Sequence, residues 1–154
     1  LIDSRKSTPY ELNLGWSVNL DRDKFIGQDA LIKEKNEGSK WQFVGLEYDW
    51  DAYEKIFTDF DLPPQPPGEA WRDGVPVYNN SGKQIGQATS GAWSPTLKKN
   101  LALASLKTAN FSMGDTFQIE VTVEYERKMC PVTVSKPMFF NPERKRSKYD
   151  PDNK

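Results

Sequence analysis

The sequence has no histidine and a single cysteine, Cys130. Without an imidazole, the chain can assemble neither a Ser-His or Cys-His nucleophile nor a histidine-bound zinc or haem site. Any acid–base chemistry would therefore fall to Asp, Glu, Lys or Tyr side chains. One cysteine cannot form an internal disulfide, which fits a reducing compartment, so we expect a cytoplasmic protein. We expect Cys130 itself to be a small buried apolar group on a strand.

The chain also lacks an excess of either charge, because its 21 Lys and Arg residues nearly balance its 22 Asp and Glu residues. No overall field favours nucleic acid, and an oligonucleotide-binding barrel would need a basic groove with exposed aromatic rings. No apolar run approaches the ~20 residues that a membrane-spanning helix needs, and no signal-peptide pattern opens the chain. We therefore expect neither a nucleic-acid nor a membrane partner.

The 154 residues suffice for one domain with one hydrophobic core. The chain begins at Leu1 and its first methionine is Met113. We therefore expect it to be a piece of a longer protein.

What the chain does have is a series of short segments with the alternating pattern of half-buried strands. Asn79-Asn80-Ser81-Gly82 is a strong hairpin-turn sequence between strand-like segments at 75–78 and 83–91. A charged hairpin tip at 124–128 separates the last two strands. Six or so short strands predict a mainly β fold with a few short helices, built as an antiparallel six-stranded barrel of Greek-key or jelly-roll type. The other strands are expected at Trp41–Tyr48, Phe117–Val123 and Cys130–Val134.

The stretch from Gly86 to Leu106 is the most distinctive in the chain. Gly91 and Pro95 are expected to interrupt two strand-like runs, with small hydroxyl residues supplying turn chemistry between them. The second run, Asn100 to Leu106, is small and apolar, as a strand buried on both faces would be. The local pattern alone predicts a strand–turn–strand corner of the kind found in any β-barrel.

The N-terminal part shows both periodicities. Apolar residues alternate over residues 12–20, which is the period of a half-buried strand and makes Trp16 a core residue. A short helix is predicted to begin at Gly27 and to stop at Gly38, a normal C-terminal glycine. We expect its buried side to be Ala30, Leu31 and Ile32, and its solvated face to be Lys33, Glu34, Lys35 and Glu37.

Residues 49–73 combine helical and proline-rich sequence. Asp51 followed by Glu54 resembles a capping box, and the prolines of residues 63–67 then favour an extended path. We therefore expect an amphipathic helix followed by a proline-rich strap. Either its aromatic side chains simply cover the barrel, or the segment forms a lid or wall over a substrate entrance. The residues that recur at helical spacing are Trp50, Tyr53, Ile56, Phe57 and Phe60.

Three blocks are specific enough to point to a family. Residues 8–16 are T-P-Y-E-L-N-L-G-W, residues 24–31 are K-F-I-G-Q-D-A-L, and residues 89–104 are T-S-G-A-W-S-P-T-L-K-K-N-L-A-L-A. In the same order they resemble T-P-x-E-x-G-L-G-W, K-x-F-I-G-K-E-A-L and T-S-G-x-x-S-P-T-L-x-K-N-x-A-L-A of the glycine-cleavage T-protein (aminomethyltransferase) family. The second block lacks the cysteine of K-G-C-Y-x-G-Q-E, which marks the related folate-binding proteins of iron–sulfur assembly.

The resemblance implies a division of the chain. Residues 1–38 would be the end of a folate-binding core with its linking helix. Residues 39–142 would be the C-terminal β-barrel, with the insertion at 49–73. Residues 143–154 would form a basic tail, which we expect to be disordered.

The resemblance also implies tetrahydrofolate as the cofactor. The candidate folate-binding residues are Tyr10, Glu11, Trp16, Arg144 and Arg146. Tyr10 and Glu11 have the alternative role of capping or pairing beside a strand, and the two arginines that of a solvated tail. The catalytic aspartate and most of the folate pocket are expected upstream, so the isolated chain should be inert. Its expected partners are that upstream folate-binding domain and a small methylated or aminomethyl donor.

Two functional hypotheses follow. The first is a tetrahydrofolate-dependent aminomethyltransferase or demethylase, because the insertion at 49–73 departs from the family pattern and suggests a paralogue. The second is a non-catalytic barrel module of a larger flavin-linked dehydrogenase of the dimethylglycine or sarcosine type. A G-x-G-x-x-G motif far upstream would favour the dehydrogenase, and a folate core with its aspartate would favour the transferase.

Overall fold

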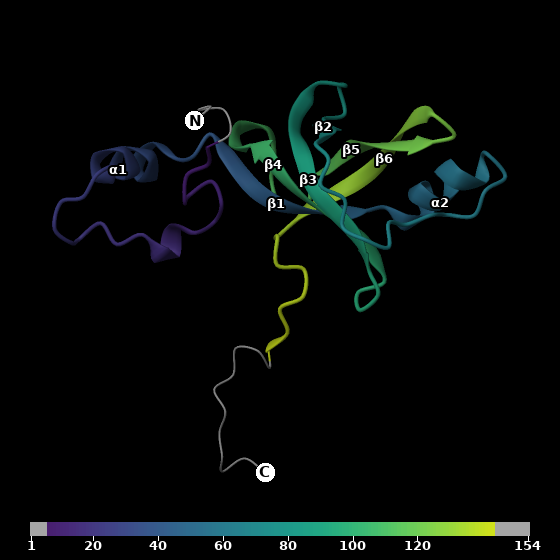
Figure 1. Ribbon diagram of the computed structural model, residues 1–154. Helices are drawn as coiled ribbons and strands as arrows, with labels where there is room; N and C mark the ends of the chain where they lie inside the picture. The colour runs from purple at the N-terminus through teal and green to yellow at the C-terminus, as the bar shows by residue number, and fades with distance from the viewer. Residues whose placement is uncertain (1–5, 144–154) are drawn as a thin grey trace, which may run out of the picture.

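The computed structural model describes residues 6–143, and its centre is a closed antiparallel β-barrel (Figure 1). The six strands are β1 (Trp41–Tyr48), β2 (Val75–Tyr78), β3 (Gln84–Ser94), β4 (Lys99–Lys107), β5 (Thr116–Val123) and β6 (Glu126–Ser135). Their order around the wall is β1-β4-β3-β2-β5-β6, and pairing of β1 with β6 closes the ring. Strands β2, β3 and β4 follow one another as neighbours while β1 lies beside β4, which is a Greek key. The predicted six-stranded barrel is confirmed.

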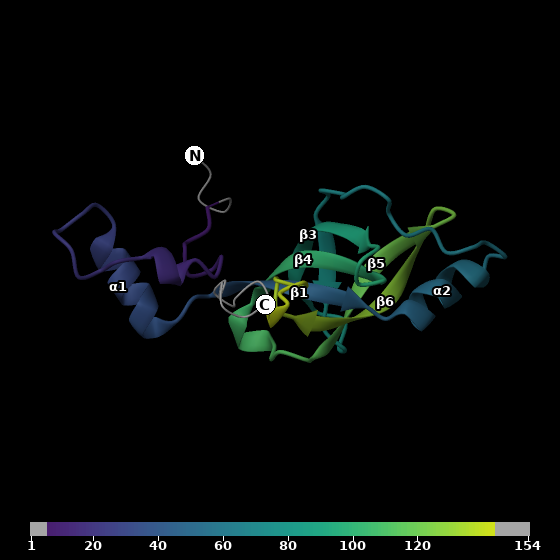
Figure 2. The same ribbon diagram turned by 90° about the horizontal axis from the view of Figure 1, so that it is seen from below.

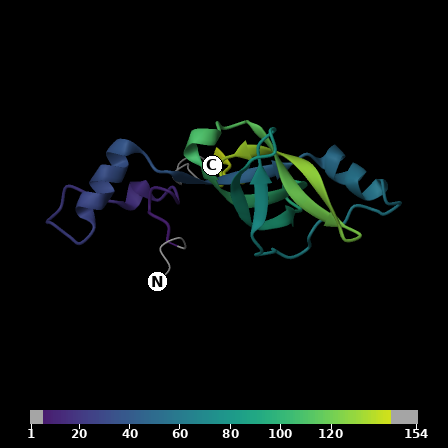
Figure 3. The same cartoon turned by 90° about the horizontal axis from the view of Figure 1, so that it is seen from above.

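Only short helical segments accompany the barrel. They are α1 (Gln28–Glu37), α2 (Trp50–Thr58) and the 3₁₀ turns η2 (Gly15–Ser17) and η3 (Thr108–Asn110). Figures 1, 2 and 3 show α1 and the N-terminal segment beyond one end of the barrel and α2 beyond the other. No helix within residues 6–143 is long and apolar enough to cross a membrane.

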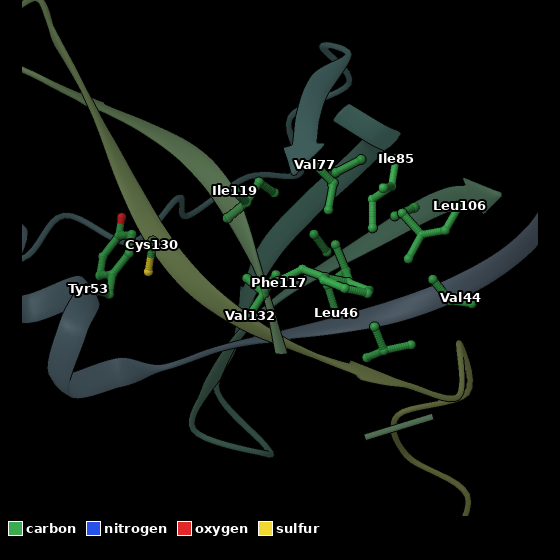
Figure 4. Close-up of a cluster of buried hydrophobic side chains, with 14 of the residues drawn as sticks. Val44, Leu46, Tyr53, Val77, Ile85, Leu106, Phe117, Ile119, Cys130 and Val132 are labelled. Atoms are coloured by element: carbon green, nitrogen blue, oxygen red, sulfur yellow. The ribbon is translucent and has the colours of Figure 1, made fainter. Parts of the chain in front are cut away.

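The core fills the barrel with inward-facing side chains from all six strands (Figure 4). Alternate residues of a strand point to opposite faces, so Val44 and Leu46 of β1 and Ala102, Ala104 and Leu106 of β4 all enter this core. In β3 the core residues Ile85 and Ala88 are three apart, because the pairing of this strand shifts register. Burial of one such aliphatic side chain contributes about 1.5–3 kcal/mol. Cys130 is fully buried on β6, as predicted. The largest fully buried side chains are Val44, Leu46, Val77, Ile85, Leu106, Ile119, Cys130 and Val132.

The distinctive stretch forms β3 and β4, but its turn lies later than predicted. Strand β3 continues through Gly91 to Ser94, and the chain turns only over Pro95 to Lys98. Gly91 is therefore not a break; its missing side chain makes room for the ring of Trp71. In β4, residues 100–102 are all buried, but Leu103 and Ser105 are only half-buried, so the predicted burial on both faces holds for the first part of the strand alone.

The last hairpin is tighter than expected. Strand β5 ends at Val123 and β6 begins at Glu126, so the tip consists of Glu124 and Tyr125 alone. Both have positive φ, 48° and 65°, as a two-residue hairpin turn of the primed type requires. The rest of the predicted tip, including Arg127, belongs to β6.

The strand predicted over residues 12–20 is absent. These residues form turns and η2, and Leu12, Leu14 and Trp16 are exposed by 38%, 43% and 84%. A half-buried strand needs an edge to pair with and an apolar surface to cover, and no strand within residues 6–143 pairs with this segment. Trp16 is consequently not a core residue of the structure described.

Helix α1 begins and ends where predicted but turns a different face inward. Its N-cap is Gly27 and its C-cap Gly38, whereas the buried residue is Gln28 and Ala30 and Ile32 are exposed. The Gln28 side chain donates from Nε2 to the Leu20 carbonyl at 2.8 Å, so a polar contact and not an apolar stripe holds the preceding loop.

Glu34 is likewise not a solvated side chain. Its Oε1 accepts hydrogen bonds from the hydroxyls of Thr8 and Ser39, each at 2.7 Å. Helix α1 is thereby joined to the N-terminal segment and to the start of the barrel. A pattern based on charge alone could not separate Glu34 from its exposed neighbours.

Helix α2 confirms the amphipathic helix predicted in the insertion. Its cap is Asp49, whose Oδ1 accepts from the Ala52 N–H at 2.9 Å, and not the predicted Asp51. Tyr53 and Phe57 are buried in the barrel core, while Trp50, Ile56 and Phe60 pack at its edge. The aromatic side chains of this helix therefore do cover one end of the barrel.

Candidate functional site

A cleft of about 640 Å³ opens beside residues 62–74, the proline-rich strap that returns from α2 to β2. We call it the strap cleft. Helix α2 and the strap form one side, and the strands β1, β2, β4, β5 and β6 supply the rest. The residues that define it are Tyr48, Tyr53, Trp71, Asp73, Asn100 and Glu120.

Backbone hydrogen bonds fix the strap to the barrel. The Trp71 N–H donates to the Gly91 carbonyl at 3.0 Å, and the Gly91 N–H donates back at 3.4 Å. The Trp93 N–H donates to the Pro67 carbonyl at 3.1 Å. The Tyr53 hydroxyl donates to the Gln65 carbonyl at 2.9 Å. The proline-rich segment thus has a defined path as a wall of the cleft.

Aromatic rings form much of that wall. The rings of Tyr48 and Tyr53 lie edge to face, with centroids 5.8 Å apart and planes at 86°. Burial, with a smaller effect of the neighbouring Cys130, raises the pKa of Tyr48 and raises that of Tyr53 to about 12. Both phenols are consequently protonated and uncharged at neutral pH. The Tyr53 hydroxyl already donates to the Gln65 carbonyl, and its ring is covered by Trp50 and Phe57. The half-buried Tyr48 is therefore the phenol that offers a ring and an O–H group to the cleft, without negative charge.

Asn100 is the polar residue buried next to these rings. Its side chain is 3% exposed, and its Oδ1 has no hydrogen-bond partner within residues 6–143. A buried carbonyl oxygen without a partner costs about 1–3 kcal/mol. Such a group at a cleft calls for a donor that residues 6–143 do not supply. Sequence reasoning missed this residue, although a lone amide at the head of a small apolar strand was a usable signal.

Two carboxylates lie at the cleft with one guanidinium. Glu120 accepts a hydrogen bond from the Tyr78 hydroxyl at 2.7 Å, and this bond is the main cause that raises the pKa of Tyr78. The Arg127 Nε lies 4.0 Å from Glu120 and is largely exposed, so their attraction is weak. Asp73 is exposed at the rim.

The cleft has the size and lining to bind a small molecule, but the residues that define it include no activated nucleophile. Cys130 lies nearby, but burial raises the pKa of its thiol to about 12, so at neutral pH it is not a thiolate. Its Sγ points to the Asp49 carbonyl at 3.9 Å. Within the described range, no group of His, Cys, Asp or Glu side chains is arranged to hold a metal ion.

The predicted folate-binding residues lie elsewhere, on the N-terminal segment. The Thr8 N–H donates to Glu11 Oε2 at 3.1 Å, and the Glu11 N–H donates to Thr8 Oγ1 at 3.2 Å. The Tyr10 ring packs on Gly15, and its hydroxyl is buried with no partner in the described part of the chain. Trp16 projects into solvent. Glu11 therefore has a capping role, which was one of its two predicted roles.

Arg144 and Arg146 lie outside the described residues, as does most of the predicted tail at 143–154. The structure brings Tyr10, Glu11 and Trp16 together within one short segment. It separates them from the strap cleft by the length of the barrel (Figure 1).

Comparison with known proteins agrees with the motifs. Residues 58–141 match the family described as the glycine cleavage T-protein C-terminal barrel domain. The aminomethyltransferase of Geobacillus sp. (strain WCH70) is 38% identical over 138 residues, which are 89% of this chain and 32% of that protein. The aminomethyltransferase of Synechococcus elongatus is 36% identical over 135 residues, 87% of this chain and 30% of that protein.

A solved structure shares the fold. The glycine cleavage system aminomethyltransferase T from Bartonella henselae superposes with a TM-score of 0.63 and 22% identity, over 86% of this chain and 32% of that one. The chain thus spans about a third of the length of the relatives it matches. It belongs to the glycine-cleavage T-protein family, of which it carries the C-terminal barrel domain.

Proposed function

We propose that this chain is the C-terminal part of a tetrahydrofolate-dependent one-carbon transferase, which moves an aminomethyl or methyl carbon from a small donor onto folate. The observation that carries the proposal is the identity of 36–38% to proteins named aminomethyltransferase along nearly the whole chain. Because the chain corresponds to about one-third of such a protein, its barrel would form one wall of a larger enzyme. We further propose a cytoplasmic location, in line with the single free thiol.

The N-terminal segment fits a partial folate site. Trp16 exposes 84% of its surface, so its indole is available to stack on an aromatic ring. The buried hydroxyl of Tyr10 has no partner among the residues that the structure describes, and it could donate to, or accept from, a bound molecule. Glu11 would act indirectly, because its carboxylate holds the Thr8 N–H. When bound, tetrahydrofolate would supply the nitrogen atoms that accept the one-carbon unit.

The same segment also suits a contact with an upstream domain. Leu12, Leu14 and Ile26 are exposed apolar residues on this arm, which extends away from the barrel (Figure 2). Exposed apolar side chains such as these favour burial against another surface. We propose that the folate-binding domain covers them and supplies the catalytic aspartate, so that the isolated chain is inert.

The basic tail provides the remaining proposed contact. Arg144 or Arg146 would hold the carboxylates of the folate glutamate tail, because a guanidinium matches carboxylate geometry in a bidentate manner. In the longer protein, Arg144→Ala should weaken folate about tenfold, since a charge-assisted hydrogen bond contributes roughly 1.5–3 kcal/mol. Arg144→Lys should recover part of the loss. A change below twofold for both Arg144→Ala and Arg146→Ala would mean that the tail is solvated.

Titration calorimetry tests the proposal as a whole. Tetrahydrofolate should bind the longer protein at least about a hundredfold more tightly than this chain, a difference of about 2.7 kcal/mol. Within the longer protein, Trp16→Ala should weaken binding, while Tyr125→Ala, at the exposed tip of the last hairpin, should not. Equal affinity of the two proteins, or no folate binding by the longer one, would overturn the proposal.

A further inference from the structure

The strap cleft carries a buried acceptor that the fold leaves unused. Asn100 Oδ1 is buried without a hydrogen-bond partner in residues 6–143, and the Asn100 side chain lines the cleft. An oxygen in this position is satisfied only by a group that donates a hydrogen bond. A ligand that enters the cleft and carries an N–H or O–H would remove the cost of leaving this oxygen unpaired.

The walls of the cleft select the charge of that ligand. The rings that a ligand in the cleft can reach are those of Tyr48 and Trp71, which are both half-buried, whereas the Tyr53 ring is covered by its neighbours. Aromatic faces attract cations through the negative potential above the ring, most strongly for tryptophan. Because both phenols remain uncharged at neutral pH, the attraction to a cation comes from the rings and not from phenolate charge.

The rim adds net negative charge. The carboxylates of Asp73 and Glu120 face the cleft against the single guanidinium of Arg127. The Arg127 side chain is 77% exposed, and its Nε lies 4.0 Å from Glu120 Oε2, beyond hydrogen-bonding distance. An anionic ligand would meet two carboxylates, and a neutral ligand would gain nothing from them. A cation gains from the rim and from the rings together.

We propose that the strap cleft binds a small organic ammonium ion that carries at least one N–H, of the secondary or tertiary alkylammonium class. The N–H would donate to Asn100, the alkyl groups would lie against Tyr48 and Trp71, and the positive charge would face Asp73 and Glu120. The proposal concerns binding alone. It does not depend on folate or on the transfer reaction, because all of these residues belong to the barrel and its strap.

Nuclear magnetic resonance titration of the ¹⁵N-labelled chain tests it directly. Trimethylammonium is the probe, and tetramethylammonium has nearly the same shape and charge but no N–H. Neutral tert-butanol controls for apolar burial, and sodium chloride controls for ionic strength. The readouts are the Trp71 indole N–H and the Asn100 side-chain amide, which spectra of Trp71→Phe and Asn100→Leu assign.

Trimethylammonium should shift both resonances along a saturable curve. Tetramethylammonium should bind at least threefold more weakly, and tert-butanol at least tenfold more weakly. If tert-butanol bound as tightly as trimethylammonium, the cleft would recognise apolar shape and not positive charge, and the proposal would be overturned. Shifts that sodium chloride reproduces, or equal affinity for the two ammonium ions, would overturn it as well.

Substitutions at the rim give results of opposite sign. Asp73→Asn should weaken trimethylammonium about threefold, as expected for one partly screened carboxylate, and Arg127→Gln should strengthen it about twofold. Glu54→Gln removes an exposed carboxylate on α2 outside the cleft and should change nothing. Asn100→Leu should abolish the preference for trimethylammonium over tetramethylammonium. Because Asp73 and Arg127 are exposed, their variants keep the proposal testable even where Asn100→Leu fails to fold; unchanged affinity in both would refute it.

Discussion

The indole ring of Trp71 packs so closely on Gly91 that a Cβ atom at residue 91 would collide with its Cζ2. The same two residues exchange two backbone hydrogen bonds, so the strap pairs with β3 at this one bridge. A side chain on residue 91 would therefore displace both the ring and the pairing. The glycine of the T-S-G motif thus fixes where the strap crosses the barrel.

Gly91→Ala should consequently destabilise the protein. A methyl group forced into this contact should cost about 1–3 kcal/mol, the usual range for overpacking. Urea denaturation followed by circular dichroism measures the change. The matched control is Gly68→Ala on the same strap, where a Cβ meets nothing within 4 Å and the expected change lies within about 0.5 kcal/mol. Equal stability of the two variants would show that the strap yields freely at Gly91.

Tyr53 anchors the other end of the strap. Its hydroxyl donates to the Gln65 carbonyl at 2.9 Å, and the side chain is 4% exposed. Tyr53→Phe keeps the ring in the core and removes only this bond, so it should cost about 1 kcal/mol in urea denaturation. Tyr125→Phe is the control, because Tyr125 is 99% exposed. A loss shared by both variants would assign the effect to something other than the Gln65 bond.

Much of the barrel was predictable because its signals are local. The alternation in β5 and β6 follows directly from the two faces of a strand, and Asn79 to Gly82 is a hairpin turn by sequence alone. The helix in the insertion followed from aromatic spacing, and Tyr53 and Phe57 occupy its buried face as that spacing requires. In each case the residues of a single element were enough to predict its structure.

The failures share a physical cause, which is dependence on a distant partner. Alternation over residues 12–20 predicts a strand only if an edge is available, and none is present in residues 6–143. Gly91 resembles a break until the ring of Trp71 is known to lie on it. The strap cleft could not be predicted either, because Asn100, Trp71 and Glu120 come together only when the barrel closes.

Glu34 should hold the N-terminal segment in place. Its carboxylate accepts from the Thr8 and Ser39 hydroxyls, so Glu34→Ala removes two charge-assisted hydrogen bonds. The opening free energy of the amides at 11–18 should fall by about 1–3 kcal/mol, measured by hydrogen exchange. Glu37→Ala, on the exposed end of the same helix, should leave those amides unchanged. Equal exchange in the two variants would mean that Glu34 does not secure the segment.

The stability of the chain should fall as the pH rises above about 9, and Cys130 should be one cause. Its thiol has an ordinary pKa of 9.0, which burial raises to about 12 in the folded protein. A raised folded pKa means that the unfolded chain releases the proton first, so the stabilisation is complete below pH 9 and is lost progressively toward pH 12. From pH 8 to pH 10 this thiol alone should lower the free energy of unfolding by about 1.4 kcal/mol.

Urea denaturation at the two pH values measures the loss, and Cys130→Val should show a loss smaller by that amount. Tyr53 has an ordinary pKa of 10.0, which the folded protein raises to about 12, so its contribution to the loss begins at a higher pH than that of the thiol. A loss that persists in Cys130→Val should therefore begin at higher pH. If the variant and the parent chain lose the same free energy between pH 8 and pH 10, the buried thiol is not the group that titrates.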